Sequence, residues 1–254
     1  MLWAIDVGNT HTVYGRWDGQ RWRAQWRLPT DPSRTEDQLA AELASLCALA
    51  ELPFSAQQVV IGSVNPGVNE ALDRLAREWL GAEPIFLRSG EDVGLRVTYD
   101  PPRSVGPDRL ANALGVLTKY QAPAIVVDFG TATTFDAISR EGVYLGGAIL
   151  PGINLAFESL YQKAALLPRV PFRAPETTIG KDTPGAIQSG VVLGYAFGIE
   201  GLAVRMKQEL GGKVLVISTG GLGEQFLELC PSIERYDADL TLDGLVEAHR
   251  RLTA

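Results

Sequence analysis

A-I-V-V-D-F-G-T-A-T-T-F-D, residues Ala124 to Asp136, is the stretch that decides the fold we predict for this chain. Its first four residues are apolar, as in a strand that is buried on both faces. The apolar run ends at Asp128, a turn with Gly130 and threonine hydroxyls follows, and a second apolar run begins. A carboxylate at the end of a strand can hold a cation, and a neighbouring glycine lets backbone N–H groups reach phosphate oxygens. The pattern therefore predicts a hairpin that binds a nucleotide phosphate.

The same pattern occurs at the N-terminus. Apolar residues lead into D-V-G-N-T, which begins at Asp6, and a second apolar run follows. In this hairpin Asp6 would hold Mg²⁺ directly or through water, although an Asx-type turn also explains a single D-x-G sequence. Two copies about half a chain apart, each after an apolar strand and each opening a hairpin, indicate an internal duplication.

The composition narrows the possible functions. The chain has 254 residues, 46% of them hydrophobic, which is enough for one large domain or two small ones. Its net charge of −7 argues against a nucleic-acid-binding protein, but backbone amides and Mg²⁺ let an acidic protein bind ATP. Cys47 and Cys230 lie in apolar stretches and are expected to be buried thiols. We expect a cytoplasmic protein, because neither a signal peptide nor an apolar run of membrane-spanning length is recognisable.

Hydrophobic periodicity predicts alternating strands and helices in both halves. In the first half, strands are expected at 2–8, 12–17, 21–28, 59–64 and 83–87, and helices at 36–51 and 68–80. In the second half, strands are expected at 124–129, 133–139, 143–149 and 213–217, and helices after Pro151-Gly152 and at 184–210, 223–230 and 241–252. A helix at 108–119 would join two lobes, residues 1–118 and 119–254.

The sequence G-P-D-R at Gly106 to Arg109 is a candidate for chemistry. Pro107 suits the first turn of a helix and Asp108 suits the helix dipole, which explains both residues without a function. The adjacent Arg109 is not explained in this way. An arginine at this place could bind an anionic substrate, and Asp108 could accept the proton of an attacking hydroxyl group.

Two further stretches are weaker signals. S-T-G-G-L-G, from Ser218 to Gly223, could let an adenine ring or a phosphate lie against the backbone, but an ordinary turn between a strand and a helix explains it equally well. Thr183 before Pro184 fits a helix N-cap, and a capping residue can also face a ligand.

Taken together, these motifs resemble the type III pantothenate kinases over nearly the whole chain. The combination of G-x-D-R with V-D-x-G-T-A-x-T is specific, whereas either piece alone is not. In chain order the matching motifs are D-V-G-N-T at Asp6, Y-x-x-P at Tyr99, G-P-D-R at Gly106, V-D-F-G-T-A-T-T-F-D at Val127, G-G-A-I-L-P-G at Gly146 and S-T-G-G at Ser218. One departure is Asn65, where the family would have an apolar residue.

The resemblance implies an α/β fold with duplicated ribonuclease-H-like lobes, the actin-like ATPase architecture of sugar kinases, Hsp70 and actin, with a cleft between the lobes. It implies ATP-dependent phosphorylation of pantothenate, the first step of coenzyme A biosynthesis. It also implies a homodimer whose substrate pocket lies partly at the subunit interface.

The resemblance assigns roles to particular residues. Asp108 would be the proton acceptor, and Asp128 would bind a monovalent cation, K⁺ or NH₄⁺. The residues expected to bind ATP are Asp6, Val7, Gly8, Asn9, Thr10, His11, Thr12, Val13 and Thr131. Those expected to contact pantothenate are Tyr99, Gly106, Pro107, Asp108, Arg109 and Thr183.

Two other functions fit the residues. The first is a kinase of the same fold that acts on another small molecule, such as a sugar or a carboxylate. Fold alone does not determine the substrate of such an enzyme. The G-P-D-R element argues against it, and a panel of substrates would discriminate. A nucleotide-dependent regulatory or scaffolding protein is the other. The presence of both hairpin acids and of Asp108 argues against that alternative.

Overall fold

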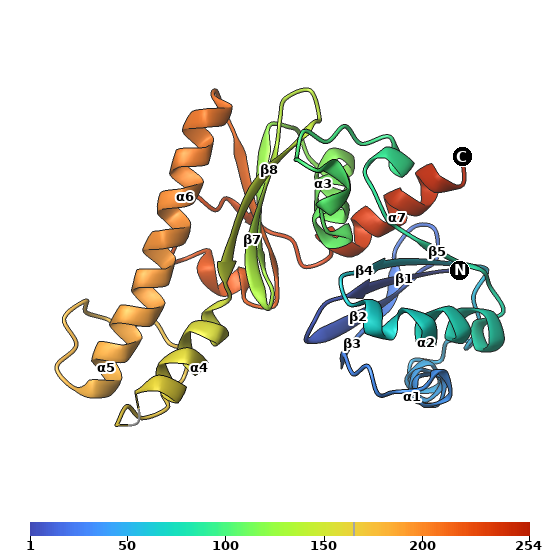
Figure 1. Cartoon of the computed structure of the whole chain (residues 1–254), viewed down its shortest axis with the longest axis horizontal. Coiled ribbons are helices and arrows are strands. Elements are labelled where there is room, and N and C mark those ends of the chain that lie inside the picture. The colour runs from blue at the N-terminus through green and yellow to red at the C-terminus, as the bar shows by residue number, and fades with distance from the viewer. Residues whose placement is uncertain (165) are drawn as a thin grey trace. The chain divides into compact units, whose positions relative to one another are not determined.

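The structure, a computed structural model, describes residues 1–164 and 166–254. The chain forms two compact units (Figure 1). The first contains Met1–Tyr120 and Asp239–Ala254, and the second contains Gln121–Ala238. Each unit has a mixed five-stranded sheet with its own hydrophobic core.

The first unit is built on a sheet with the strand order β3-β2-β1-β4-β5. β1 pairs antiparallel with β2 and parallel with β4, so that the first hairpin lies beside a parallel strand. The strands are β1 (Leu2–Val7), β2 (His11–Trp17), β3 (Trp22–Pro29), β4 (Gln58–Ser63) and β5 (Pro84–Phe86). The helices before residue 107 are α1 (Glu36–Leu49), η1 (Pro66–Val68), α2 (Asn69–Arg74), η2 (Leu75–Leu80), η3 (Glu91–Val93) and η4 (Pro102–Ser104).

The second unit repeats this topology. Its sheet has the order β10-β9-β6-β7-β8, and β6 pairs antiparallel with β7 and parallel with β9. The strands are β6 (Ala124–Phe129), β7 (Ala132–Ile138), β8 (Tyr144–Pro151), β9 (Leu215–Gly220) and β10 (Arg235–Tyr236). The helices are α4 (Ile153–Lys163), α5 (Thr183–Gln188), η5 (Ser189–Leu193), α6 (Gly194–Leu210) and η6 (Gly223–Phe226). Since β6 to β10 occupy the positions of β1 to β5, the duplication expected from the two D-x-G hairpins is confirmed.

The apolar strands form the cores. In the first unit Trp3, Ile5 and Val7 of β1 pack with residues of α1 and α2 in one cluster. In the second unit Ile125 and Val127 of β6 pack with residues of α4 and α6. Alternate residues of each strand face the same core, as expected for a strand with a side-chain period of two. Both cysteines are buried and unpaired, as predicted.

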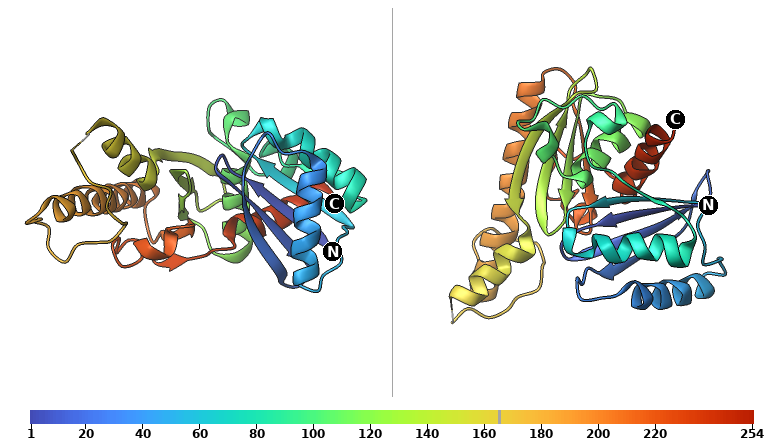
Figure 2. Two further views of the ribbon diagram at one scale, coloured as in Figure 1. Left: turned by 90° about the horizontal axis from the view of Figure 1, so that it is seen from below. Right: turned by 45° about the vertical axis from the view of Figure 1, so that its right-hand side comes forward.

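The C-terminal helix α7 (Leu240–Leu252) belongs to the first unit, whereas the sequence analysis placed it in the second lobe. It packs beside α3 (Pro107–Lys119) (Figures 1 and 2). The two helices approach closely because glycines face backbone: a Cβ on Gly244 would lie 1.8 Å from the Ala111 carbonyl oxygen, and one on Gly115 would lie 2.4 Å from that of Leu240. The contact is made across more than a hundred residues of chain, and local periodicity does not reveal it.

Two other expectations need correction. The predicted helix at 223–230 is only the short 3-10 helix η6, with turns after it. The sequence analysis expected no stretch that could span a membrane, but the helical stretch Thr183–Leu210 is long and apolar enough by length and composition, with a mean hydropathy of 1.4 in its most apolar window. Val192, Ile199 and Ala203 of this stretch pack in the core of the second unit, and 28% of its most apolar window is buried.

Candidate active site

The β1–β2 hairpin carries the first group of predicted site residues. A tight turn closes it, in which the Gly8 N–H donates to the His11 carbonyl oxygen at 3.0 Å. A Cβ on Gly8 would lie 2.9 Å from that oxygen, so the turn requires glycine. Asn9 and Thr10 are exposed at its tip. The tip of the hairpin therefore exposes small polar residues.

Side chains beside the turn hold the hairpin in place. The Thr12 hydroxyl lies 2.8 Å from that of Thr30, and the Arg27 guanidinium donates to His11 Nδ1 at 3.1 Å. Burial and the Arg27 charge lower the pKa of His11, so the imidazole is neutral at pH 7. Val13 stands opposite Asp6 in the ladder. All eight residues expected from Asp6 to Val13 thus belong to one hairpin.

The G-P-D-R motif begins α3. Gly106 is the N-cap, and the Asp108 carboxylate turns back to accept the Arg109 N–H at 2.8 Å. A Cβ on Gly106 would lie 2.4 Å from Asp108 Oδ1, so the glycine provides the space that this carboxylate occupies. Burial raises the pKa of the Asp108 carboxyl above its ordinary value of 3.8, and the Arg109 N–H and guanidinium oppose the shift. A carboxylate with a raised pKa is a better proton acceptor.

Tyr99 and Arg109 lie together, as their shared expected role requires. The Arg109 guanidinium carbon is 5.9 Å from the centroid of the Tyr99 ring, within the range of a cation–π contact. Arg109 is buried. A buried guanidinium beside a tyrosine suits a ligand with a carboxylate.

The hairpin and the G-P-D-R motif meet at the end of β4. The Val64 N–H donates to the Val7 carbonyl oxygen at 3.0 Å, and the Val64 side chain lies 3.6 Å from the Cβ position of Gly106. Gly62 lies beside Asp6 in the sheet, and its Cβ position is 3.7 Å from Pro107. Gly62 and Val64 were not among the predicted site residues. Their only signal was that they end a buried strand.

The β6–β7 hairpin also closes on a glycine N–H, with a turn one residue shorter than that of the first hairpin. The Gly130 N–H donates to the Ala132 carbonyl oxygen at 3.0 Å, and the Gly152 N–H donates to that of Thr131 at 3.1 Å. A Cβ on Gly152 would lie 2.3 Å from the Thr131 oxygen, which explains the last glycine of G-G-A-I-L-P-G. The exposed Thr131 lies at the tip.

The S-T-G-G stretch lies against Asp128. Thr219 is the neighbour of Asp128 in the parallel ladder. Gly220 has a φ of +82°, and a Cβ there would lie 2.6 Å from Asp128 Oδ1. Only glycine combines this backbone conformation with room for the carboxylate. The motif that looked weakest in the sequence thus shapes the surroundings of the predicted cation ligand.

Thr183 is not the helix cap that we predicted. Asp182 is the N-cap of α5, and its carboxylate accepts the Gly185 N–H at 2.7 Å. Both residues can cap a helix, and Asp182 has the extended backbone of a cap. Thr183 is therefore the first residue of the helix. It is exposed and lines a hollow of about 710 Å³ with apolar residues of α4 and α5.

Asn65 also has a structural role. Its side chain accepts the Gly67 N–H at 3.1 Å and caps η1, which accounts for a polar residue at the place where the sequence comparison led us to expect an apolar one.

Comparison with known proteins gives a consistent result. The family model described as type III pantothenate kinase matches residues 2–205. A type III pantothenate kinase from Paramagnetospirillum magneticum is 46% identical over 99% of this chain and 97% of its own length. One from Phenylobacterium zucineum is 43% identical over 99% and 98%.

A solved structure supports the fold. The ROK hexokinase from Thermus thermophilus matches with a TM-score of 0.53 and 17% identity, over 97% of both chains. Together with the two mixed sheets of equal topology, this likeness shows the α/β fold of the actin-like ATPases and sugar kinases.

Proposed function

The chain belongs to the type III pantothenate kinase family, which makes it an enzyme that phosphorylates pantothenate with ATP in coenzyme A biosynthesis, and from this premise we propose that Asp108 is the general base of the reaction. The observation that carries the proposal is the environment of its carboxylate. Burial raises the pKa of this group, and the neighbouring pair Tyr99 and Arg109 suits an acidic substrate. Asp108 would accept the proton of the pantothenate hydroxyl group as its oxygen attacks the γ-phosphorus of ATP.

Pantothenate would lie against the start of α3. The Arg109 guanidinium is the cation for its carboxylate, and the Tyr99 ring covers that guanidinium. Gly106 and Pro107 would contact the substrate beside Asp108. Holding both ends of the substrate orients the hydroxyl group toward its base, which is a large part of catalysis by positioning.

ATP would bind to both hairpins. Backbone N–H groups and hydroxyls from Asp6 to Val13 are donors for phosphate oxygens, and Thr131 adds a hydroxyl from the second hairpin. Asp6, a carboxylate at the end of β1, would hold a divalent cation directly or through water, and such a cation neutralises phosphate charge. We assign a monovalent cation, K⁺ or NH₄⁺, to Asp128, whose carboxylate lies against the bare Cα of Gly220.

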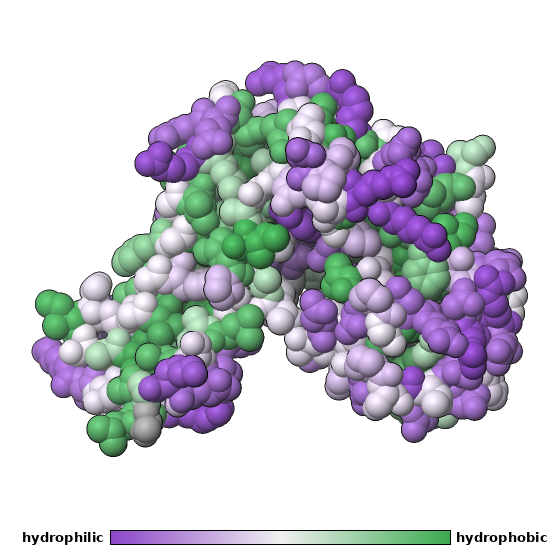
Figure 3. Space-filling model, viewed as in Figure 1, coloured by the Kyte–Doolittle hydropathy of each residue, from purple (hydrophilic) through white to green (hydrophobic). Residues whose placement is uncertain are grey.

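A homodimer would complete the pantothenate pocket with Thr183 from the partner. Figure 3 shows hydrophobic surface over α4, α5 and α6. Large apolar side chains are exposed on β8 and these helices, among them Ile149 at 62% and Phe197 at 63%. Exposed apolar residues of this size commonly mark a protein interface. Thr183 lies at the start of the same helical stretch. If these apolar residues form the dimer interface, Thr183 would lie close to the pantothenate site of the partner subunit. We place the enzyme in the cytoplasm.

The test of the base is Asp108→Asn, which keeps the acceptor for the Arg109 N–H. We expect turnover to fall by about 10²–10⁴-fold, the usual contribution of a general base, while ATP binding is retained. Glu83→Gln is the control, because it removes an exposed carboxylate that is paired with Arg77. ADP release would be followed with pantothenate in K⁺ and in Na⁺ buffer. Near-normal turnover of Asp108→Asn would refute the base, and equal turnover in both buffers would refute the K⁺ site.

A further inference from the structure

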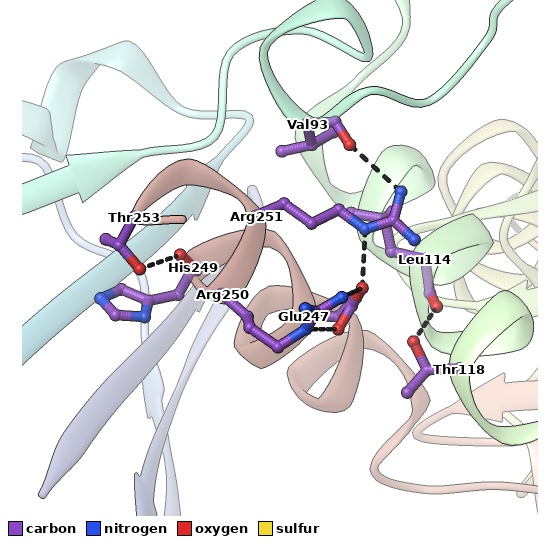
Figure 4. A network of polar contacts seen from close by, with 8 residues as sticks. All are labelled: Val93, Leu114, Thr118, Glu247, His249, Arg250, Arg251 and Thr253. Carbon is purple, nitrogen blue, oxygen red and sulfur yellow. Dashed lines mark hydrogen bonds and ion pairs between the residues drawn. The ribbon is translucent and has the colours of Figure 1, made fainter.

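The segment between β5 and α3 carries Tyr99, and it is tied to the C-terminal helix. The Arg251 guanidinium of α7 donates through Nη1 to the Val93 carbonyl oxygen at 3.1 Å (Figure 4). Val93 is buried and is the last residue of η3, where a carbonyl group lacks a partner within its own helix. Arg251 therefore provides a hydrogen-bond partner for a carbonyl group that lacks one within its own helix.

Glu247 orients this arginine. Its carboxylate is nearly buried, and Oε1 accepts Arg251 Nε at 2.6 Å, so the guanidinium bridges a carboxylate and a backbone carbonyl group (Figure 4). Arg250 binds the same carboxylate, through Nε and Nη2 at 2.7 Å each. The hydrogen bonds to the two arginines lower the pKa of Glu247 and keep it ionised at neutral pH.

The turn that Arg251 contacts, residues 90–95, leads directly into the proposed pantothenate site. The Leu95 N–H donates to the Gly90 carbonyl oxygen at 2.8 Å. A Cβ on Gly90 would lie 2.5 Å from Val97 and 3.6 Å from Leu110 of α3. The turn is thus packed tightly between the chain leading to Tyr99 and the helix that carries Asp108 and Arg109. A shift of Val93 would be passed on to Tyr99.

We propose that Arg251, oriented by Glu247, is a positioning residue for pantothenate binding: it holds the segment that carries Tyr99 in register with Arg109. The inference rests on the proposed pantothenate site. It concerns a helix outside residues 2–205, the part of the chain that the family model covers.

The test compares two arginines of the same helix. Arg251→Met removes the anchor. Arg250→Met removes an equal positive charge beside the same carboxylate. The Arg250 side chain is 69% exposed, and within residues 1–164 and 166–254 its hydrogen bonds go to Glu247 alone. We expect Arg251→Met to raise KM for pantothenate about tenfold, as loss of a charge-assisted hydrogen bond allows, with kcat and KM for ATP nearly unchanged. Arg250→Met should leave all three constants unchanged.

A second variant and a second measurement guard against a folding defect. Arg251→Lys keeps the charge but lacks the fork that reaches both partners, so a smaller rise in KM for pantothenate is expected. Amide hydrogen exchange in the full-length enzyme should become faster at residues 91–97 in Arg251→Met and remain unchanged in Arg250→Met. Equal effects of the two methionine variants, or a parallel rise in KM for ATP, would overturn the inference.

Tyr99→Leu separates this inference from the proposed site. If Tyr99→Leu raises KM for pantothenate and Arg251→Met does not, the site stands and the anchor is refuted. If neither raises it, the proposed site and the anchor both fail.

Discussion

Gly106 and Asp108 form a unit at the scale of single residues. The glycine has an ordinary φ of −60°, so backbone conformation alone does not require it. It is required because a Cβ would lie 2.4 Å from Asp108 Oδ1. The sequence shows that a glycine lies two residues before the acid. The reason for the glycine lies in the structure, where the Asp108 carboxylate points back toward the start of the helix.

We predict that Gly106→Ala moves the Asp108 carboxylate and lowers kcat by about a hundredfold, because small misplacements of a reacting group have effects of this size. The melting temperature should change little, since alanine adopts the same backbone angles. Steady-state kinetics and thermal unfolding measured on one preparation would check both statements. An unchanged kcat would show that the carboxylate position is unimportant.

The proposed role of Asp108 as the general base predicts a pH dependence of the reaction. Burial raises the pKa of this carboxyl group and the Arg109 charge opposes the rise. Activity requires the deprotonated base, so kcat/KM should fall as pH drops through the raised pKa. Arg109→Gln removes the opposing charge, which favours the protonated acid, and should move this acidic limb to higher pH. Arg103→Gln, which removes an exposed arginine paired with Glu91, is the control, and a limb that stays in place in Arg109→Gln would contradict the assignment.

At the scale of elements, the strands were predictable except for the two-residue β10, and their long-range partners were not. Apolar runs that end in D-x-G marked β1 and β6 within a residue of their observed ends. The cap of α5 was misplaced by one residue, because Asp182 and Thr183 are both good caps. The return of α7 to the first unit was not predictable, since it depends on the match of Gly115 and Gly244 to backbone far away in the sequence.

The contact between α3 and α7 yields a prediction about stability. In Gly244→Ala the new Cβ would lie 1.8 Å from the Ala111 carbonyl oxygen, so the helices must separate. We expect the free energy of unfolding to fall by about 1–3 kcal/mol, the usual cost of overpacking. Gly198→Ala in α6, where no atom lies within 4 Å of an added Cβ, should be neutral or stabilising by up to about 1 kcal/mol. Urea denaturation of both variants makes the comparison, and equal stabilities would refute the close helix contact.

At the scale of the whole molecule, duplication explains why the chemistry is spread over the chain. Each unit places an aspartate and a glycine turn at the end of its first strand, and the first unit alone adds the G-P-D-R helix. The copies have diverged in their additions: the second unit carries the long helical stretch Thr183–Leu210 with its exposed apolar residues. The two hairpins carry the residues that we propose for ATP, whereas the G-P-D-R helix that we propose for pantothenate occurs in the first unit only.

The proposed dimer predicts complementation between two inactive proteins. Asp108→Asn lacks the base, and Thr183→Glu places a negative charge where the pantothenate carboxylate would bind. If each site combines Asp108 of one subunit with Thr183 of its partner, a mixed dimer has one site that is intact in both residues. Random exchange in a two-fold dimer makes half of the dimers mixed, each with one such site, so activity should recover to about one quarter of the wild-type value. Mixing the proteins under exchange conditions and following ADP release would measure it. No recovery, with exchange shown by mass spectrometry of differently tagged subunits, would mean that both residues act within one chain.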